Sequence, residues 1–159
     1  RYLEKRDFNL YVKHYRMEKG KDVEALIPHR APFLFVDEIL SANEKEIIGV
    51  YTFKKDTDVF IKGSFPELEF VPGTILIESM AQCGGAGVRL LGVSKGVFAL
   101  AQIESAQFFK AVTYDEQVRY EIAIQRMSEK IIKQSGIAYV GDVKVVEASW
   151  MSIRIDSAQ

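Results

Sequence analysis

The sequence predicts an α+β domain in which one long helix lies on an antiparallel sheet. Two observations support this class. The run Thr74–Leu91 is apolar or small on almost every face, which is typical of a helix buried on all sides. After this run the hydrophobic period falls to two, which is typical of strands with one face toward a core. These elements fit a single domain over residues 21–159.

The chain before the first strand is predicted to form an extension and a short helix. Residues 1–20 mix charged and aromatic side chains without a clean period, and we interpret them as an N-terminal extension. Asp22 is a suitable N-cap for a short helix that ends at Pro28, because proline disfavours helical geometry in the residue before it. The apolar run Phe33–Leu40 then predicts the first strand.

The next elements lead to the long helix. The run Ile47–Phe53 is apolar on both alternating faces, which predicts a central strand. Residues 54–70 are rich in charged and turn residues and predict a loop, whose length is typical of a functional segment. Pro72 and Gly73 fit the start of the helix, because proline lacks a donor that the first turn cannot use and glycine allows close approach of a ligand.

Four strands are predicted after the helix. Their ranges are 97–103, 117–125, 130–140 and 143–155. Residues 117–125 alternate apolar and polar side chains, as expected for a strand with one solvated face. Gly141-Asp142 between the last two ranges is typical of a tight hairpin turn. The order of elements therefore favours an antiparallel sheet with the helix on one face.

Composition and charge exclude several classes of protein. The 21 basic and 22 acidic residues create no overall field that would attract nucleic acid or a membrane, and residues 1–21 are the only basic segment. The single cysteine, Cys83, rules out an intrachain disulfide and suits a reducing compartment. The helical run Thr74–Leu91 carries charge and is too short to cross a bilayer. We expect a cytoplasmic protein with no membrane span and no nucleic-acid partner.

One carboxylate lies inside the apolar helix. Burying an unpaired carboxylate costs on the order of several kcal/mol, so Glu78 must be paired, neutral or retained for chemistry. Gln82 lies one turn further along the same helical face. A structural ion pair would also explain Glu78, but its central position favours a functional site.

Several motifs resemble those of one known family. They are Pro28-His29-Arg30-Ala31-Pro32-Phe33-Leu34-Phe35-Val36-Asp37, Gly63-Ser64-Phe65-Pro66, Val71-Pro72-Gly73 through Glu78-Ser79-Met80-Ala81-Gln82, and Phe108-Phe109-Lys110. In this order they resemble the FabZ type of (3R)-hydroxyacyl-acyl carrier protein dehydratases, over residues 23–155. The resemblance implies a hot-dog fold, a curled sheet around a long helix, in a homodimer or in a hexamer assembled from dimers. It also implies acyl carrier protein as the partner, in fatty-acid or polyketide-type acyl-chain biosynthesis.

The chemistry of that family is the removal of water from a 3-hydroxyacyl thioester. It requires a base for the C2 proton, an acid for the leaving hydroxyl and a donor for the thioester carbonyl. The resemblance implies that Glu78 is the acid and that a backbone N–H at Gly73 is the donor. The expected substrate contacts are Gly73, Gln82, Phe65 and Pro72.

Ser64 is the most informative departure from the family, whose base is a histidine at this position. A serine hydroxyl is not basic near neutral pH, and loss of a general base costs about 10²- to 10⁴-fold in rate. The two histidines, His14 and His29, are not expected to replace it. Because the family combines the base loop of one protomer with the helix acid of the other, we expect a base-deficient subunit. It would supply Glu78 to a His-bearing paralogue in a heteromeric dehydratase.

Other interpretations stay open. Ser64 and a water could serve an independent hot-dog enzyme, as a slow dehydratase or a thioesterase. The chain could instead bind acyl thioesters or acyl carrier protein without catalysis, or Ser64 could be an engineered replacement of histidine. No His or Cys cluster has metal-ligand spacing, and no Gly-rich phosphate loop follows a strand, so no metal or cofactor is expected.

Overall fold

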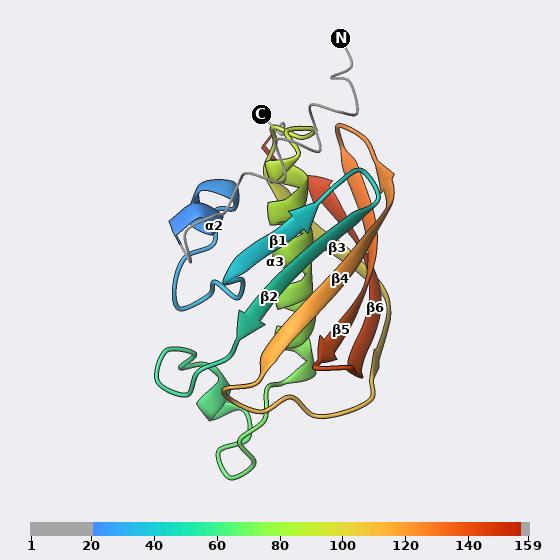
Figure 1. Cartoon of the computed structure of the whole chain (residues 1–159). Coiled ribbons are helices and arrows are strands. Elements are labelled where there is room, and N and C mark those ends of the chain that lie inside the picture. Colours follow the sequence, from blue (N-terminus) through green and yellow to red (C-terminus); the bar gives the residue numbers. More distant parts are fainter. Residues whose placement is uncertain (1–20, 157–159) are drawn as a thin grey trace.

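The computed structural model describes residues 21–156, so the extension predicted over residues 1–20 lies outside the described residues. The helices are α2 (Lys21–Leu26), η1 (Ile61–Gly63, a 3₁₀ turn) and α3 (Gly73–Leu90). The strands are β1 (Glu38–Ala42), β2 (Glu46–Thr52), β3 (Phe98–Phe108), β4 (Gln117–Met127), β5 (Ile131–Val140) and β6 (Val143–Arg154). They form one antiparallel sheet in the order β1-β2-β4-β5-β6-β3, which curls around α3 (Figure 1). The predicted α+β class is confirmed.

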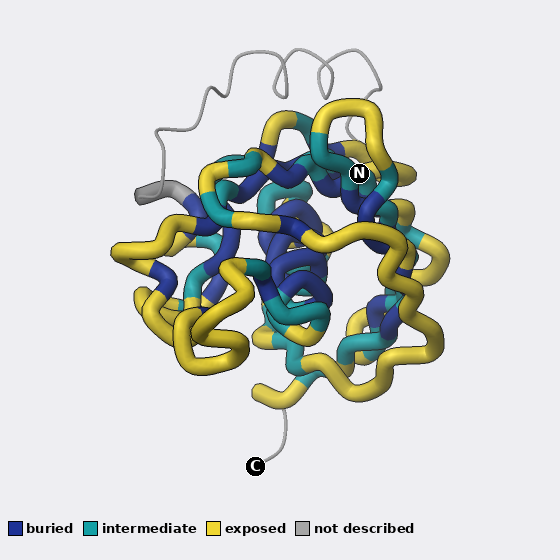
Figure 2. Tube along the Cα trace, turned by 90° about the horizontal axis from the view of Figure 1, so that it is seen from below, coloured by how far each residue is buried: buried dark blue, intermediate teal, exposed yellow. Residues whose placement is uncertain are grey.

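The long helix packs closely because small residues face the sheet. A Cβ added at Gly87 would lie 2.4 Å from the Ile47 side chain of β2, and one at Gly84 would lie 2.3 Å from the Gln134 side chain of β5. Figure 2 shows the buried turns of α3 near the centre of the molecule. The predicted burial of this helix is therefore correct, although Thr74 and Arg89 are exposed.

The core lies between α3 and the concave face of the sheet. Its largest side chains with almost no exposed surface are Trp150, Tyr120, Phe35, Phe53, Ile47, Ile61 and Met80. Several come from alternating positions of the strands, because every second strand residue points to the same face. This alternation is the period-two signal that predicts the strands.

The apolar run that begins at Phe33 is not the strand that its sequence predicts. Strand β1 begins only at Glu38. The backbone of Phe35 bonds instead to side chains of α3: its N–H donates to Gln82 Oε1 at 2.8 Å, and its carbonyl accepts from the Ser79 hydroxyl at 2.6 Å. These bonds use the groups that a strand would offer to a neighbour, so the run is apolar because it packs against the helix.

Three predicted boundaries also differ. Helix α2 begins at Lys21, so Asp22 is not its N-cap. The loop over residues 54–70 contains the short η1 turn. Strand β3 continues to Phe108 rather than ending at Ile103. Almost all of β3 is exposed on both faces, so its second half carries no alternation that could reveal a strand.

Strand β3 is one edge of the sheet. It pairs only with β6, although β4 follows it in the chain, so residues 117–154 form the three-stranded meander and β3 lies beyond it. Leu100, Ile103 and Phe108 on this edge are between 37% and 51% exposed. A long edge strand with exposed apolar side chains is a surface on which another strand can pair.

Candidate functional site

Glu78 lies in the second turn of α3 and is only partly buried. Its side chain keeps 22% of its surface exposed, although the helix around it is largely buried. Oε1 accepts a hydrogen bond from Gln82 Nε2 at 3.0 Å and lies 3.5 Å from Nε2 of His29. Within residues 21–156, Oε2 makes no hydrogen bond. The carboxylate is therefore held through one oxygen and presents the other.

Gln82 fixes the Glu78 side chain to the backbone before β1. The predicted neighbour relation between these two helix residues is confirmed. The Gln82 amide also accepts the Phe35 N–H at 2.8 Å and donates to the Phe33 carbonyl at 3.2 Å. These partners fix which end of the amide is oxygen and which is nitrogen, because only the oxygen can accept the Phe35 N–H and only the nitrogen can donate to the Phe33 carbonyl. The nitrogen therefore points to Glu78.

His29 is the residue that sequence reasoning missed. It follows the short helix α2, and its imidazole keeps 28% of its surface exposed. Burial lowers the pKa of His29 below its usual 6.5; the nearby Glu78 carboxylate opposes this shift, and Arg30 adds to it. The Pro-His-Arg motif was the available signal, but no local pattern shows that it meets Glu78 on α3.

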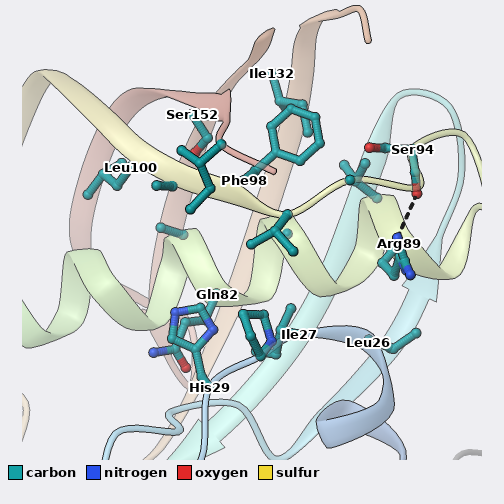
Figure 3. Close-up of a pocket in the computed structure, with 18 of the residues that line it drawn as sticks. Leu26, Ile27, His29, Gln82, Arg89, Ser94, Phe98, Leu100, Ile132 and Ser152 are labelled. Atoms are coloured by element: carbon teal, nitrogen blue, oxygen red, sulfur yellow. Dashed lines mark hydrogen bonds between the residues drawn. The ribbon is translucent and has the colours of Figure 1, made fainter. Parts of the chain in front are cut away.

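Glu78, Gln82 and His29 line one pocket of about 540 Å³. Its other walls come from α2, the start of β3 and the ends of β5 and β6. In Figure 3, His29 and Ile27 lie on one side of the α3 ribbon, and Phe98 and Leu100 lie on the other side. The pocket combines a mostly apolar lining with a few polar groups, a combination typical of sites for small organic ligands. Its charged and titratable lining residues are Glu24, Glu78, Arg30, Arg89 and His29.

The other predicted site residues lie elsewhere. Gly73 is the first residue of α3, and Pro72 is its N-cap. The ring of Phe108, at the end of β3, rests against Gly73 so closely that a Cβ there would lie 2.6 Å from it. As the first helical residue, Gly73 has an N–H without an intrahelical acceptor. This N–H and the helix dipole suit an oxygen that develops negative charge.

Ser64 and Phe65 belong to the loop between β2 and α3. Ser64 directly follows η1 and is exposed; its hydroxyl makes no hydrogen bond to any residue that the structure describes. The Phe65 ring is 45% exposed and stacks on Phe70 with centroids 4.5 Å apart. Neither residue lines the pocket that holds Glu78.

Buried polar contacts hold the start of this loop. The Asp58 carboxylate is 3% exposed and accepts hydrogen bonds from the Tyr51 hydroxyl and the Lys54 N–H, both at 2.6 Å. Burial and the hydrogen bond to Asp58 raise the pKa of Tyr51, so this hydroxyl remains a donor at all ordinary pH values. The loop that carries Ser64 is thus anchored at its β2 end.

A single chain therefore brings only two of the six predicted site residues to the pocket. Glu78 and Gln82 meet at the pocket, together with His29, whereas Ser64, Phe65, Pro72 and Gly73 do not line it. Cys83, on the same helix, is fully buried, and burial raises the pKa of its thiol, as expected for a packing residue. Among the described residues, no group of three His, Cys, Asp or Glu side chains could hold a metal ion. No helix in this part of the chain is long and apolar enough to cross a membrane.

The fold and the pocket define a hot-dog domain with a carboxylate on its central helix. Residues 27–149 match the FabA-like domain family. The chain is 36% identical over 131 residues to the 3-hydroxyacyl-acyl-carrier-protein dehydratase FabZ of Pelotomaculum thermopropionicum, covering 81% of this chain and 93% of that protein. It is 32% identical over 137 residues to FabZ of Thermoanaerobacter pseudethanolicus, covering 85% and 96%. The chain belongs to the FabZ-like 3-hydroxyacyl-acyl-carrier-protein dehydratase family.

Solved structures share the fold at low sequence identity. The dehydratase heterocomplex ApeI:P from Xenorhabdus doucetiae has a TM-score of 0.74 at 16% identity, covering 85% of this chain and 91% of that one. A hypothetical thioesterase with coenzyme A from Streptococcus pneumoniae has a TM-score of 0.58 at 13% identity, covering 84% and 91%. Both likenesses concern the fold alone.

Proposed function

We propose that this chain is a base-deficient subunit of a 3-hydroxyacyl-acyl carrier protein dehydratase, which supplies Glu78 as the acid to a partner that bears the histidine. The observation that carries the proposal is the geometry of Glu78. Oε1 is held by Gln82, Oε2 makes no hydrogen bond to any residue that the structure describes, and the side chain lines a mostly apolar pocket. A carboxyl group held in this way can give a proton to a leaving hydroxyl without moving.

The proposed carbonyl donor, Gly73, lies on a different face of α3 from Glu78. Gly73 and Glu78 are five residues apart on α3, so they are about 7.5 Å apart along the axis and point about 140° apart around it. One bound thioester cannot lie against both in a single chain without wrapping the helix. A site made from two protomers avoids this, with the carbonyl donor and the Ser64 loop from one chain and Glu78 from the other.

The exposed edge of β3 suits such a pairing. In the described part of the chain no strand pairs with its outer side, and Ile103 and Phe108 on it, with the following Phe109, are about half exposed. Pairing through β3 would also bring the Phe108 ring, which covers Gly73, to the boundary between protomers. The ApeI:P structure from Xenorhabdus doucetiae is a dehydratase heterocomplex, a precedent for unlike subunits in this fold.

In the proposed dehydration, the histidine of the partner removes the C2 proton while a backbone N–H at the start of the partner's long helix stabilises the negative charge on the thioester carbonyl; Gly73 would have this role in the second site, which carries Ser64. Glu78 then protonates the hydroxyl at C3, which leaves as water, and the C2–C3 double bond forms. Ser64 takes no proton, because its hydroxyl is not basic near neutral pH. The substrate is an acyl thioester on acyl carrier protein, as the names of the FabZ relatives indicate for those proteins.

The test introduces the missing base. The parent chain, Ser64→His, and Ser64→His combined with Glu78→Gln are purified and assayed with a 3-hydroxyacyl-acyl carrier protein. We expect Ser64→His to dehydrate about 10²- to 10⁴-fold faster than the parent, and the double variant to lose this gain. A parent that is already as fast as Ser64→His would contradict the base deficiency. A Ser64→His variant as slow as the parent would contradict the site.

The heteromer is tested by complementation. The parent is co-expressed with the His-bearing FabZ-type protein of the same genome, in which the helix carboxylate has been changed to the amide. Activity in the co-purified complex that disappears with Glu78→Gln in this chain supports a shared site. If no complex forms, or if Glu78→Gln leaves its activity unchanged, the subunit role is wrong.

Two other functions remain to be separated from this one. An independent enzyme that uses Ser64 would turn over acyl thioesters as the purified parent and would lose that activity with Ser64→Ala. A binding module would bind a 3-hydroxyacyl thioester without turnover, both alone and in the heteromer. The exposed position of Ser64, whose hydroxyl has no hydrogen-bond partner among the described residues, favours neither reaction over the subunit role.

A further inference from the structure

His29 lies beside Glu78, although the two residues are far apart in the sequence. Its Nε2 lies 3.5 Å from Glu78 Oε1, the oxygen that also accepts from Gln82. This separation is longer than a normal hydrogen bond, and catalytic contacts of this kind often shorten when substrate binds. His29 and Glu78 line the same pocket, so the contact lies at the site.

The surroundings of the ring decide which nitrogen carries its proton. Nδ1 is buried and has no hydrogen-bond partner among residues 21–156. A proton on Nδ1 would be an unsatisfied buried donor, which costs about 1–3 kcal/mol, and would turn the lone pair of Nε2 toward the carboxylate. A proton on Nε2 points at Oε1 instead. The favoured form is thus a neutral imidazole that donates from Nε2.

We propose that His29 is a positioning residue, which together with Gln82 holds Oε1 of Glu78 and so keeps Oε2 directed to the reacting hydroxyl. This inference rests on the proposed function of Glu78 as the acid. Two donors on one carboxylate oxygen restrict rotation of the group, and the remaining oxygen is then the one that carries the transferable proton. A misplacement of about 1 Å at such a group can cost roughly 10²-fold in rate.

The same geometry argues against His29 as the missing base. To act as a base, the ring would have to become a cation with a second N–H on the buried, partnerless Nδ1. The charged groups around it are Glu78 on α3, the adjacent Arg30, and Glu24 of α2, whose carboxylate lies 3.9 Å from the Arg30 guanidinium. Burial and Arg30 oppose protonation, and only Glu78 favours it. His29 therefore serves Glu78 rather than the C2 proton.

The first test does not need activity. Long-range ¹⁵N–¹H correlation spectra of histidine-labelled protein report the tautomer and the titration of each ring. The chain has two histidines, so His14→Gln assigns the signals. We expect His29 to be neutral at pH 7 with its proton on Nε2, and we expect Glu78→Gln to lower its pKa further. A proton on Nδ1, or an unchanged titration in Glu78→Gln, would overturn the inference.

The second test uses the Ser64→His chain, in which the complete reaction is expected. There, His29→Leu should lower kcat on the order of 10- to 100-fold with little change in KM. His29→Gln keeps an N–H donor and should recover part of kcat, which a merely structural role would not predict. An equal loss in both variants, or a rise in KM alone, would contradict a positioning role.

The two tests separate the inference from the function on which it rests. If Ser64→His shows no dehydration, the proposed function fails, and the spectra still decide whether His29 donates to Glu78. If His29→Leu does not fold, the comparison of His29→Gln with the Ser64→His parent decides the kinetic part.

Discussion

The side-chain amide of Gln82 joins Glu78 to the chain before β1: its nitrogen donates to Glu78 Oε1 at 3.0 Å, and its oxygen accepts the Phe35 N–H at 2.8 Å. The Gln82 side chain thus orients the Glu78 carboxylate. It also makes the backbone hydrogen bonds at Phe33 and Phe35 that a neighbouring strand would otherwise make. Stability and geometry of the site are coupled through this residue.

Replacing Gln82 should destabilise the fold as well as the site. Gln82→Leu leaves the buried Phe35 N–H without an acceptor, so we expect a loss of about 1–3 kcal/mol in the free energy of unfolding. Urea denaturation measures it. Gln125→Leu, an exposed position on β4, is the matched control and should change stability by less than about 0.5 kcal/mol. Equal effects of the two substitutions would show that the Gln82 bonds contribute little.

The hydroxyl of Ser79 should contribute more to the free energy of unfolding than the hydroxyl of Tyr120, to which it is hydrogen-bonded. Ser79 Oγ lies 2.6 Å from the Phe35 carbonyl and 2.5 Å from the Tyr120 hydroxyl, all within the core. Ser79→Ala leaves both groups without this partner and should cost about 1–3 kcal/mol, whereas Tyr120→Phe removes one hydroxyl and should cost about 0.5–1.5 kcal/mol.

A double-mutant cycle checks this relationship. In the Tyr120→Phe background, Ser79→Ala should lower the free energy of unfolding by less than in the parent. The reason is that only the Phe35 carbonyl, and no longer the Tyr120 hydroxyl, then loses its partner. Ser64→Ala is the control, since its hydroxyl has no partner in the described chain and should leave stability unchanged. Strict additivity of Ser79→Ala and Tyr120→Phe in thermal or urea unfolding would argue against the shared contact.

Two glycines of α3 should respond oppositely to the same substitution. A Cβ at Gly87 would lie 2.4 Å from the fully buried Ile47, so Gly87→Ala should cost about 1–3 kcal/mol by overpacking. A Cβ at Gly85 meets only the Ile27 side chain, at 3.9 Å, so Gly85→Ala should stabilise the helix by about 0.5–1 kcal/mol. Urea unfolding of both variants measures the difference, and a stabilising Gly87→Ala would mean that Ile47 can move aside.

Stability should fall as the pH drops below about 6.5 in a way that depends on His29. Its pKa is lower in the folded chain than the ordinary 6.5, chiefly through burial. The unfolded chain therefore binds more protons in the window just below pH 6.5, so the free energy of unfolding rises with pH there. The stability difference between the parent and His29→Gln should shrink from pH 7.5 to pH 5.5. A constant difference across this window would contradict the lowered pKa.

Much of the architecture could be predicted because its signals are local. The all-round apolar character of α3 and the alternation in β4, β5 and β6 each arise from residues a few positions apart, and the structure confirms these elements. The pairing of Glu78 with Gln82 was also predictable, since residues four apart share a helical face. The motif resemblance identified the family, which the comparisons confirm.

The remaining features depend on contacts between distant segments. The run at Phe33 has the composition of a strand, but side chains of α3 take its backbone hydrogen bonds. The second half of β3 lacks alternation because neither face is buried. The role of Ser64 stays a prediction, because it depends on a partner protomer.

The sequence by itself determined an α+β chain with Glu78 on its long helix, because helical and strand periods record which face of each element is buried. The resemblance of its motifs to the FabZ type, rather than these periods, implied the hot-dog fold. Only the tertiary structure decided that His29 lies beside Glu78, that one oxygen of this carboxylate is hydrogen-bonded at a pocket, and that Gly73 does not line that pocket. Such relations arise when the chain folds back on itself, and no local spacing encodes the distance between two atoms on separate elements.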